Sequence, residues 1–163
     1  MNFILEMIKE NFIDFLKTGT LKHFPFGIEE LRVIKMLGQT DDHAEDMESS
    51  MIRYDWTEFY FYKGDKDSSR LYGILMRPVP LAADRFNLSM NYNWLDKKLD
   101  YTDVKEQLVQ SGVKFTEIIQ VSSKKENTLL TSGNVVFSFM RGGKMIESVG
   151  RFIPLEEFEK IEI

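Results

Sequence analysis

Residues 19–42, GTLKHFPFGIEELRVIKMLGQTDD, organise the fold of the whole chain. The stretch begins with Gly19, continues as a short extended segment over 20–26, and enters a helix after Gly27. Apolar side chains then recur at helical spacing over 28–37, which predicts an amphipathic helix. Gly38 is expected to end that helix, and an acidic segment follows it.

On the amino-terminal side, residues 3–17 also have apolar side chains at helical spacing. The polar residues of this segment occupy the opposite side of the expected helix, and Gly19 follows as a left-handed terminator. We therefore expect two helices, over 3–17 and 28–37, to precede the sheet.

On the carboxyl-terminal side, residues 41–48 read DDHAEDME, five acids in eight residues, which favours a solvated loop. Residues 52–62 have aromatic side chains at both odd and even positions, and so on both faces of a strand, which is typical of a central strand. The turn-forming cluster GDKDSS at 64–69 and the apolar residues after it make 52–78 an expected hairpin.

Residues 84–94 alternate strictly between apolar and Asn or Ser side chains, which predicts a half-buried antiparallel strand. Asp100 is expected to cap a helix over 100–111, with Val104, Leu108 and Val109 facing inward. A meander of short strands follows over 115–121, 128–131, 135–140 and 145–153, and Pro154 begins a last helical turn.

The predicted class is therefore α+β, as one domain spanning residues 1–163. We expect a mostly antiparallel sheet of about six or seven strands. The two N-terminal helices and the inserted helix are expected to pack on one face of that sheet.

The composition of the chain excludes several classes of function but does not identify one. The chain has 163 residues and no cysteine, which excludes disulfides, thiolate metal sites and a thiol nucleophile. No charged signal-peptide flank and no apolar run of about 18 residues is present, so we expect a cytoplasmic chain that does not enter a membrane. A net charge of −5 without a basic stripe argues against nucleic acid as a partner.

The sequence contains no complete enzyme motif. Gly143-Lys144 resembles the end of a phosphate-binding loop, but Ser138 replaces its first glycine and Met145 replaces its hydroxyl residue. The two histidines, His23 and His43, lie in different segments, so no metal site is expected beyond an adventitious cation near His43. We expect no catalytic residue, no cofactor and no metal.

Three segments together resemble bacterial immunity-type proteins of polymorphic toxin systems. The resemblance rests on turn and core residues: Gly27, Ile28, Leu31, Val33, Leu37, Gly38 and Asp41; Tyr54 followed by Glu58-Phe59-Tyr60-Phe61; and Ser132-Gly133-Asn134-Val135-Val136-Phe137. A more distant likeness is to the small α+β repeat of the periplasmic lipoprotein and β-lactamase-inhibitor group. That group is exported, whereas we expect no signal sequence here, and the sequence contains no Cys to carry a lipid.

The resemblance implies a non-catalytic cytoplasmic protein that neutralises a toxin by direct protein–protein binding. An acidic surface would steer a basic toxin domain toward it. The candidate partner-binding residues are those of the acidic segment and, second, of the polar strand face: Asp41, Asp42, Glu45, Asp46 and Glu48, then Asn91 and Asn93.

Two alternatives stay open at this point. The polar face of 84–94 could bind a small ligand through Asn87, Asn91, Asn93 and Arg85. The same strand could instead lie at a sheet edge and pair with a second copy, as in a self-assembling structural protein. The sequence does not predict the oligomeric state.

Overall fold

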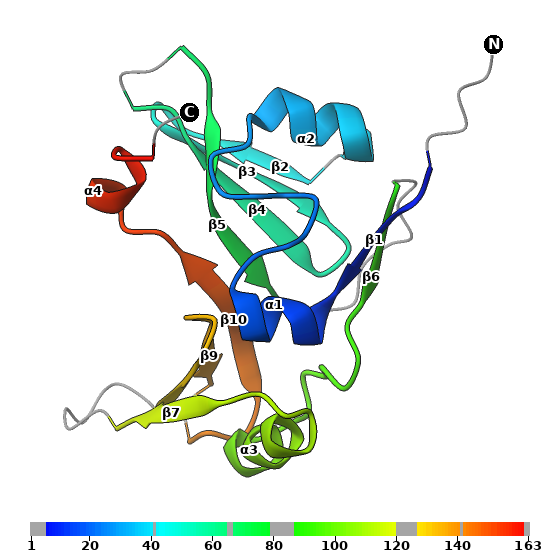
Figure 1. Ribbon diagram of the computed structural model, residues 1–163, viewed down its shortest axis with the longest axis vertical. Coiled ribbons are helices and arrows are strands. Elements are labelled where there is room, and N and C mark those ends of the chain that lie inside the picture. The colour runs from blue at the N-terminus through cyan, green and yellow to red at the C-terminus, as the bar shows by residue number, and fades with distance from the viewer. Residues whose placement is uncertain are drawn as a thin grey trace.

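The computed structural model describes residues 6–40, 42–64, 67–78, 87–119, 127–140 and 142–161 (Figure 1). Within these residues the helices are α1 (Phe12–Thr18), α2 (Glu30–Leu37), α3 (Tyr101–Gln110) and α4 (Leu155–Phe158). The strands are β1 (Ile8–Asn11), β2 (His43–Glu45), β3 (Ser49–Tyr54), β4 (Thr57–Tyr62), β5 (Arg70–Met76), β6 (Leu88–Asn91), β7 (Phe115–Ile118), β8 (Thr128–Thr131), β9 (Val136–Phe139) and β10 (Ile146–Phe152).

The main sheet has eight antiparallel strands in the order β2-β3-β4-β5-β10-β9-β8-β7. It consists of two four-stranded meanders, β2–β5 and β7–β10, whose last strands pair with each other at the centre. Each meander follows one helix, α2 in the first half and α3 in the second. The fold is therefore built from two halves of the same topology, although the sequence shows no repeat.

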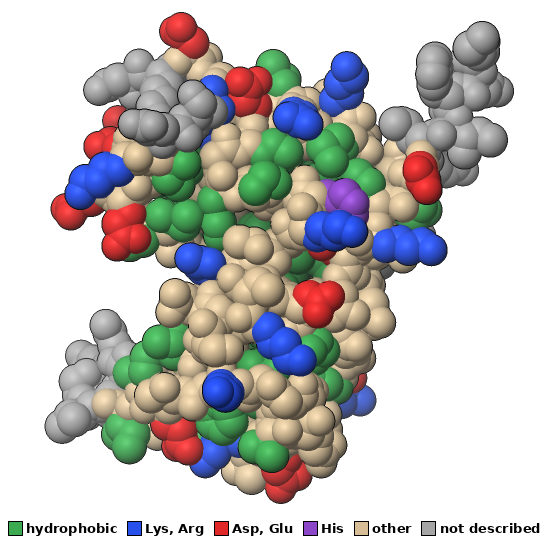
Figure 2. All heavy atoms as spheres, viewed as in Figure 1, with side chains coloured by type: hydrophobic (Ala, Val, Ile, Leu, Met, Phe, Trp, Pro, Cys, Tyr) green, Lys and Arg blue, Asp and Glu red, His purple; other side chains and the backbone are tan. Residues whose placement is uncertain are grey.

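The two halves are visible in the shape of the molecule. Figure 1 shows α2 beside the half formed by β2–β5, α3 beside the half formed by β7–β9, and α1 between them. The space-filling view in Figure 2 shows two lobes and an indented outline between them. A separate pair of parallel strands, β1 and β6, lies beside α1.

The core lies between the main sheet and the helices α1, α2 and α3. Phe12 of α1 is fully buried and contacts Phe137 of β9 edge to face, with ring centroids 6.3 Å apart. Phe24, from the segment between α1 and α2, contacts Phe59 of β4 in the same way at 5.1 Å. These large buried rings bring both halves of the sheet into one continuous core.

The α+β class and the large antiparallel sheet are as predicted, but the strand number and the helix bounds differ. The main sheet has eight strands rather than six or seven. Leu31 and Val109, predicted to face the core from their helices, are 75% and 69% exposed. The helix over 100–111 is confirmed as α3, with a capping box in which Asp100 and Asp103 each bond the other's backbone N–H.

The predicted helix over 3–17 is wrong over its first described part. Residues 8–11 form β1, and the helix begins only at Phe12. Asn11 sets this boundary, because its side-chain oxygen accepts from the backbone N–H groups of Ile13 (2.9 Å) and Asp14 (3.3 Å). Gly19 ends the helix in the left-handed conformation, as predicted.

The predicted single strand over 52–62 is also wrong, because two strands and a tight turn occupy 49–62. β3 ends at Tyr54, Asp55 takes a φ of 56°, and β4 begins at Thr57. The hairpin predicted over 52–78 survives as the β4–β5 pair. Asp tolerates the left-handed conformation, so this turn needs no glycine and gives a weak sequence signal.

The segment predicted as an antiparallel strand over 84–94 is described from residue 87 onward. Its strand, β6, covers only Leu88–Asn91 and pairs in parallel with β1, outside the main sheet. The alternating pattern was read correctly as a strand, but its partner is far away in the sequence and could not be read from the segment itself.

Candidate functional site

The predicted acidic site maps to a single hairpin. Asp41 lies outside the described residues, and Asp42, Glu45, Asp46 and Glu48 are all exposed on the β2–β3 hairpin or just before it. The segment is therefore an edge strand and a turn rather than a loop. Met47, at the tip of this turn, is 97% exposed between two acids.

Asp46 has a structural role in this turn. Its carboxylate accepts from the backbone N–H groups of Glu48 (2.9 Å) and Ser49 (2.8 Å) and from the Ser49 hydroxyl (2.9 Å). These hydrogen bonds lower the pKa of Asp46, that with the backbone of Glu48 having the largest effect. Asp42, in turn, lies 3.6 Å from Arg53. Glu45 and Glu48 therefore offer their charges most freely to a partner.

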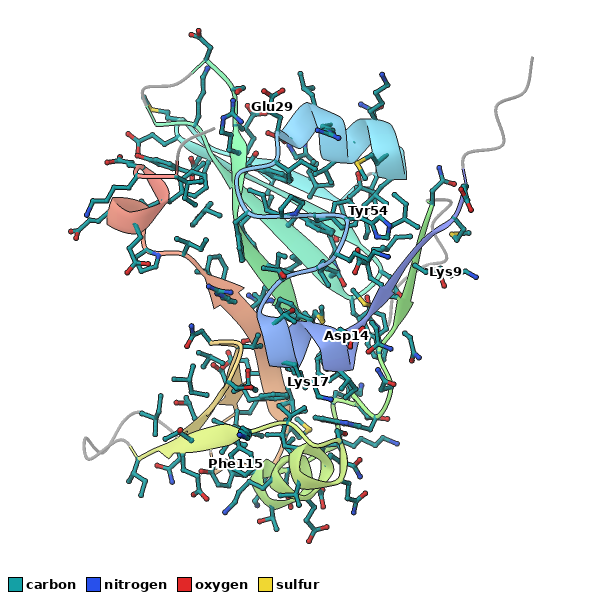
Figure 3. All side chains as sticks on the ribbon, viewed as in Figure 1. Lys9, Asp14, Lys17, Glu29, Tyr54 and Phe115 are labelled. Carbon is teal, nitrogen blue, oxygen red and sulfur yellow. The ribbon has the colours of Figure 1, made fainter. Side chains whose placement is uncertain are left out.

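Asn91 and Asn93 are not brought together with the acidic hairpin, because they belong to β6 and the turn after it. Asn91 lines a groove of about 510 Å³ beside β1 and α1. Figure 3 labels Lys9 and Asp14, two further residues of this groove. Asn87 and Asn93 do not line it, and the Asn93 side chain bonds to Asn11 (3.4 Å) and to the carbonyl of Asn91 (3.2 Å). The three asparagines thus do not form a common binding site.

A surface that the sequence reading missed lies on the other face of the sheet. Phe59 and Phe61 of β4 are buried in the core, so the alternating residues Tyr60 and Tyr62 point to the opposite side. Tyr72 of β5 and Phe152 of β10 join them there. We call these four side chains, Tyr60, Tyr62, Tyr72 and Phe152, the aromatic face.

The rings of the aromatic face contact one another in a continuous row. Ring centroids are 5.1 Å apart for Tyr60 and Phe152, 5.7 Å for Phe152 and Tyr72, and 6.1 Å for Tyr72 and Tyr62. The ring of Phe158 of α4 also lies near this row, with its centroid 6.2 Å from that of Tyr72. The three tyrosines are half-buried and Phe152 is 44% exposed.

Gly73 makes this arrangement possible. It lies directly under Phe152, and a Cβ atom at this position would lie 2.2 Å from that ring. Two sequence features therefore pointed to the aromatic face. One is the pair of tyrosines at alternate positions of β4, and the other is a glycine inside the neighbouring strand. Both are weak without the pairing of β5 with β10, which brings Phe152 over Gly73.

A buried carboxylate lies beside the aromatic face. Glu58 is only 5% exposed, accepts from the Tyr60 hydroxyl at 2.7 Å, and forms an ion pair with Arg77 at 3.3 Å. Burial, and then the hydrogen bond to Glu58, raise the pKa of Tyr60 to about 12. The Tyr60 ring is therefore held in one orientation by a hydrogen bond at neutral pH.

The acidic hairpin and the aromatic face adjoin. Burial, and then the negative charge of Asp46, raise the pKa of Tyr72. The backbone also connects them, because Lys63, next to Tyr62, donates its N–H to the carbonyl of Glu48 at 2.9 Å. The turn of the hairpin therefore lies at the edge of the aromatic face, whereas Glu45 pairs with Ser50 and so lies on the α2 side of the sheet.

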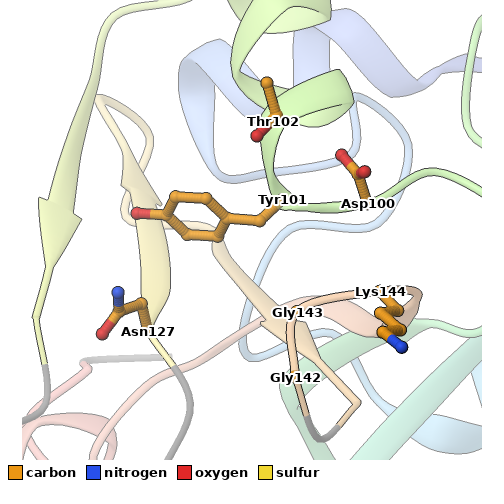
Figure 4. Close-up of a pocket in the computed structure, with 7 residues that line it drawn as sticks. All are labelled: Asp100, Tyr101, Thr102, Asn127, Gly142, Gly143 and Lys144. Carbon is orange, nitrogen blue, oxygen red and sulfur yellow. The ribbon is translucent and has the colours of Figure 1, made fainter.

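A third feature lies at the start of α3, where Gly142, Gly143 and Lys144 border a pocket of about 330 Å³ (Figure 4). Figure 4 shows Tyr101 on one side of this pocket and Lys144 on the other. The Gly143 carbonyl accepts from the N–H of Tyr101 at 2.9 Å, so Gly143 supports the start of α3.

The described residues contain no group of three or more His, Asp or Glu side chains placed to hold a metal ion. None of the described helices has the length and apolar character needed to cross a membrane. Comparison with protein-family models, curated proteins and solved structures finds no match to this chain.

Proposed function

We propose that the chain is a non-catalytic protein-binding domain. In its specific form, the proposal is a cytoplasmic immunity-type protein that neutralises a toxin by binding it directly. The observation that supports this most is the aromatic face, together with the acidic hairpin beside it.

The aromatic face has the composition of a protein-binding surface. Tyr and Phe are enriched at protein interfaces, where rigid rings bury large areas at a small entropic cost. The tyrosines are already fixed by ring contacts and, for Tyr60, by the hydrogen bond to Glu58. Such prior ordering lowers the free-energy cost of binding.

The acidic hairpin, at the edge of the sheet, gives the chain a preferred class of partner. Glu45 and Glu48 are exposed and make no side-chain hydrogen bond or ion pair with the described residues. Their charges attract a basic protein surface and increase the association rate at low salt. A basic toxin domain is therefore the partner that the charges favour.

The experiment begins with the reading frame immediately upstream in the source genome. Its carboxyl-terminal domain is expressed in a heterologous bacterium with and without this chain, and growth is recorded. We expect a toxic domain whose effect the chain abolishes, and a stable complex by calorimetry. An upstream product that is not toxic, or a toxic one that the chain neither binds nor neutralises, contradicts the proposed function.

Two pairs of variants locate the binding surface. Phe152→Ala should weaken the complex by about 2 kcal/mol or more, as for a central aromatic contact. The control Leu31→Ala removes an exposed apolar side chain on α2 and should bind as wild type does.

The double variant Glu45→Lys with Glu48→Lys should slow association most at low salt. The control Glu6→Lys with Glu106→Lys changes the net charge equally and should slow association less. If both test variants bind as the controls do, this surface is not the binding site.

A further inference from the structure

A separate cavity lies between the segment that precedes α2, the start of α2 itself, and the end of the chain after α4. It has a volume of about 480 Å³, within the usual range of small-molecule sites. Figure 3 labels Glu29, which marks the start of α2 beside this cavity. The aromatic face and the acidic hairpin contribute no residue to it.

The walls of the cavity are apolar. They are formed by Pro25, Phe26, Ile28 and Ile161, three from the segment before α2 and one from beyond α4. Gly27 lies between them with a φ of 91°, and the Ile161 side chain would lie 3.8 Å from a Cβ atom there. On the face shown in Figure 2, hydrophobic side chains gather over the region of the α1–α2 segment, with Lys and Arg side chains beside them.

Two arginines give this apolar cavity a positive charge, although the chain as a whole is acidic. Arg70 donates to the Gly27 carbonyl (3.1 Å) and to Glu29 (3.2 Å), and its buried Nε has no hydrogen-bond partner among the described residues. The Arg32 guanidinium is exposed and has no ion-pair or hydrogen-bond partner among the described residues. The single carboxylate of the lining, Glu29, is paired with Arg70.

Further polar groups of the lining do not cancel this charge. His23 lines the cavity, but its Nδ1 is already bonded to the buried Glu10 at 2.8 Å. Outside the lining, Arg151 lies over the Phe26 ring, with its guanidinium carbon 5.3 Å from the centroid. The cavity therefore combines an apolar body with two arginines, of which Arg32 lacks an anionic partner among the described residues.

We propose that this cavity binds a small amphipathic anion, namely a carboxylate or sulfonate attached to an aromatic or aliphatic body. Arg32 binds the anionic group, since the guanidinium matches the geometry of two acceptor oxygens, and the charge of Arg70 beside it adds to the attraction. The apolar walls cover the body of the ligand. The inference is independent of the proposed toxin-binding function, because it uses none of the same residues.

Two fluorescent dyes of nearly the same shape test the proposal. The anionic probe is 8-anilinonaphthalene-1-sulfonate, and the neutral one is N-phenyl-1-naphthylamine, which lacks the sulfonate. We expect the folded chain to bind the anionic dye at one site and more tightly than the neutral dye. Arg32→Glu should weaken binding of the anionic dye by about tenfold or more and leave that of the neutral dye unchanged.

Matched variants separate this site from general effects of charge and folding. Lys35→Glu changes the net charge by the same amount on the same helix, outside the cavity, and should bind both dyes as wild type does. Ile161→Ala should weaken both dyes together. The proposal is overturned if wild type binds neither dye, if Arg32→Glu binds the anionic dye as wild type does, or if Lys35→Glu loses it equally.

Discussion

At the scale of single residues, Gly133 is a position where the structure leaves no room for a side chain. A Cβ atom there would lie 2.5 Å from the backbone N of Gly19 and 2.7 Å from the carbonyl oxygen of Leu16. The Gly133 N–H also donates to that same carbonyl at 3.2 Å. The turn after β8 can thus approach the end of α1 only without a side chain.

We expect Gly133→Ala to lower the free energy of unfolding by about 2–3 kcal/mol, because backbone atoms must move to accommodate the methyl group. Gly112→Ala is the control. Gly112 has a left-handed φ of 67° but nothing within 4 Å of its Cβ position, so strain alone applies, at about 1–2 kcal/mol. Urea unfolding measures both variants. Equal losses would show that crowding at Gly133 is not the main constraint.

Among the candidate site residues, the acids and the aromatics differ in how far the sequence could reveal them. Glu45 and Glu48 were predicted as exposed charges from composition alone, and they are exposed. Asp46 was predicted as a binding residue, yet its oxygens are used by the turn. Phe152 could not be predicted, since its exposure depends on Gly73, which lies in another strand.

At the scale of elements, the β2–β3 turn depends on the ionisation of Asp46. Its hydrogen bonds to the backbone of Glu48 and Ser49 favour the carboxylate and lower its pKa in the folded state. A lowered pKa means that this contribution is present above the unfolded value of about 3.9 and is lost as pH falls through the folded pKa. The turn should therefore loosen in acid.

We expect amide hydrogen exchange at Ser49, corrected for its intrinsic rate, to become faster relative to the core as pH falls below about 4. Asp46→Asn keeps a side-chain acceptor without the charge, so it should remove this acid dependence. Glu48→Gln, whose carboxylate makes no hydrogen bond among the described residues, should retain it. If exchange at Ser49 still becomes faster in acid in Asp46→Asn, another titrating group causes the acid dependence.

Elements with local signals were predicted best. α3 has its own cap in Asp100, and Gly19 ends α1 as a glycine in the left-handed region. β1 was mistaken for helix because its apolar spacing fits either period over four residues. What decides it is the parallel pairing with β6, about 80 residues away, and no pattern within residues 8–11 contains that information.

At the scale of the whole molecule, the two halves meet along β5 and β10, and the core is continuous across that junction. A helix followed by a meander was predicted for the second half only, because the first half was predicted as a helix, a loop and a hairpin. The pairing of β5 with β10 was not predicted. That pairing turns two small meanders into one eight-stranded sheet and creates the aromatic face across the junction. The binding surface is thus a property of the assembled sheet.

The tyrosines make the stability of the whole fold sensitive to alkaline pH. Burial is the main cause that raises the pKa of Tyr54, Tyr60 and Tyr101 to about 12 each. A raised folded pKa favours the protonated phenol, so the stabilisation is complete below the unfolded value of about 10. It is lost as pH rises from there to about 12, because the unfolded chain releases these protons first.

We therefore expect the free energy of unfolding, measured in urea, to be level near pH 8–9 and to fall steeply between about pH 10 and 12. Tyr54 is fully buried and donates to the Gly38 carbonyl at 2.6 Å. Tyr54→Phe loses that hydrogen bond at every pH, but it should reduce the alkaline slope by up to about 1.4 kcal/mol per pH unit. The slope is the test. If Tyr54 has only a structural role, Tyr54→Phe lowers the free energy of unfolding by the same amount at every pH and leaves the slope unchanged. If the slope of Tyr54→Phe equals that of wild type, Tyr54 does not titrate with unfolding.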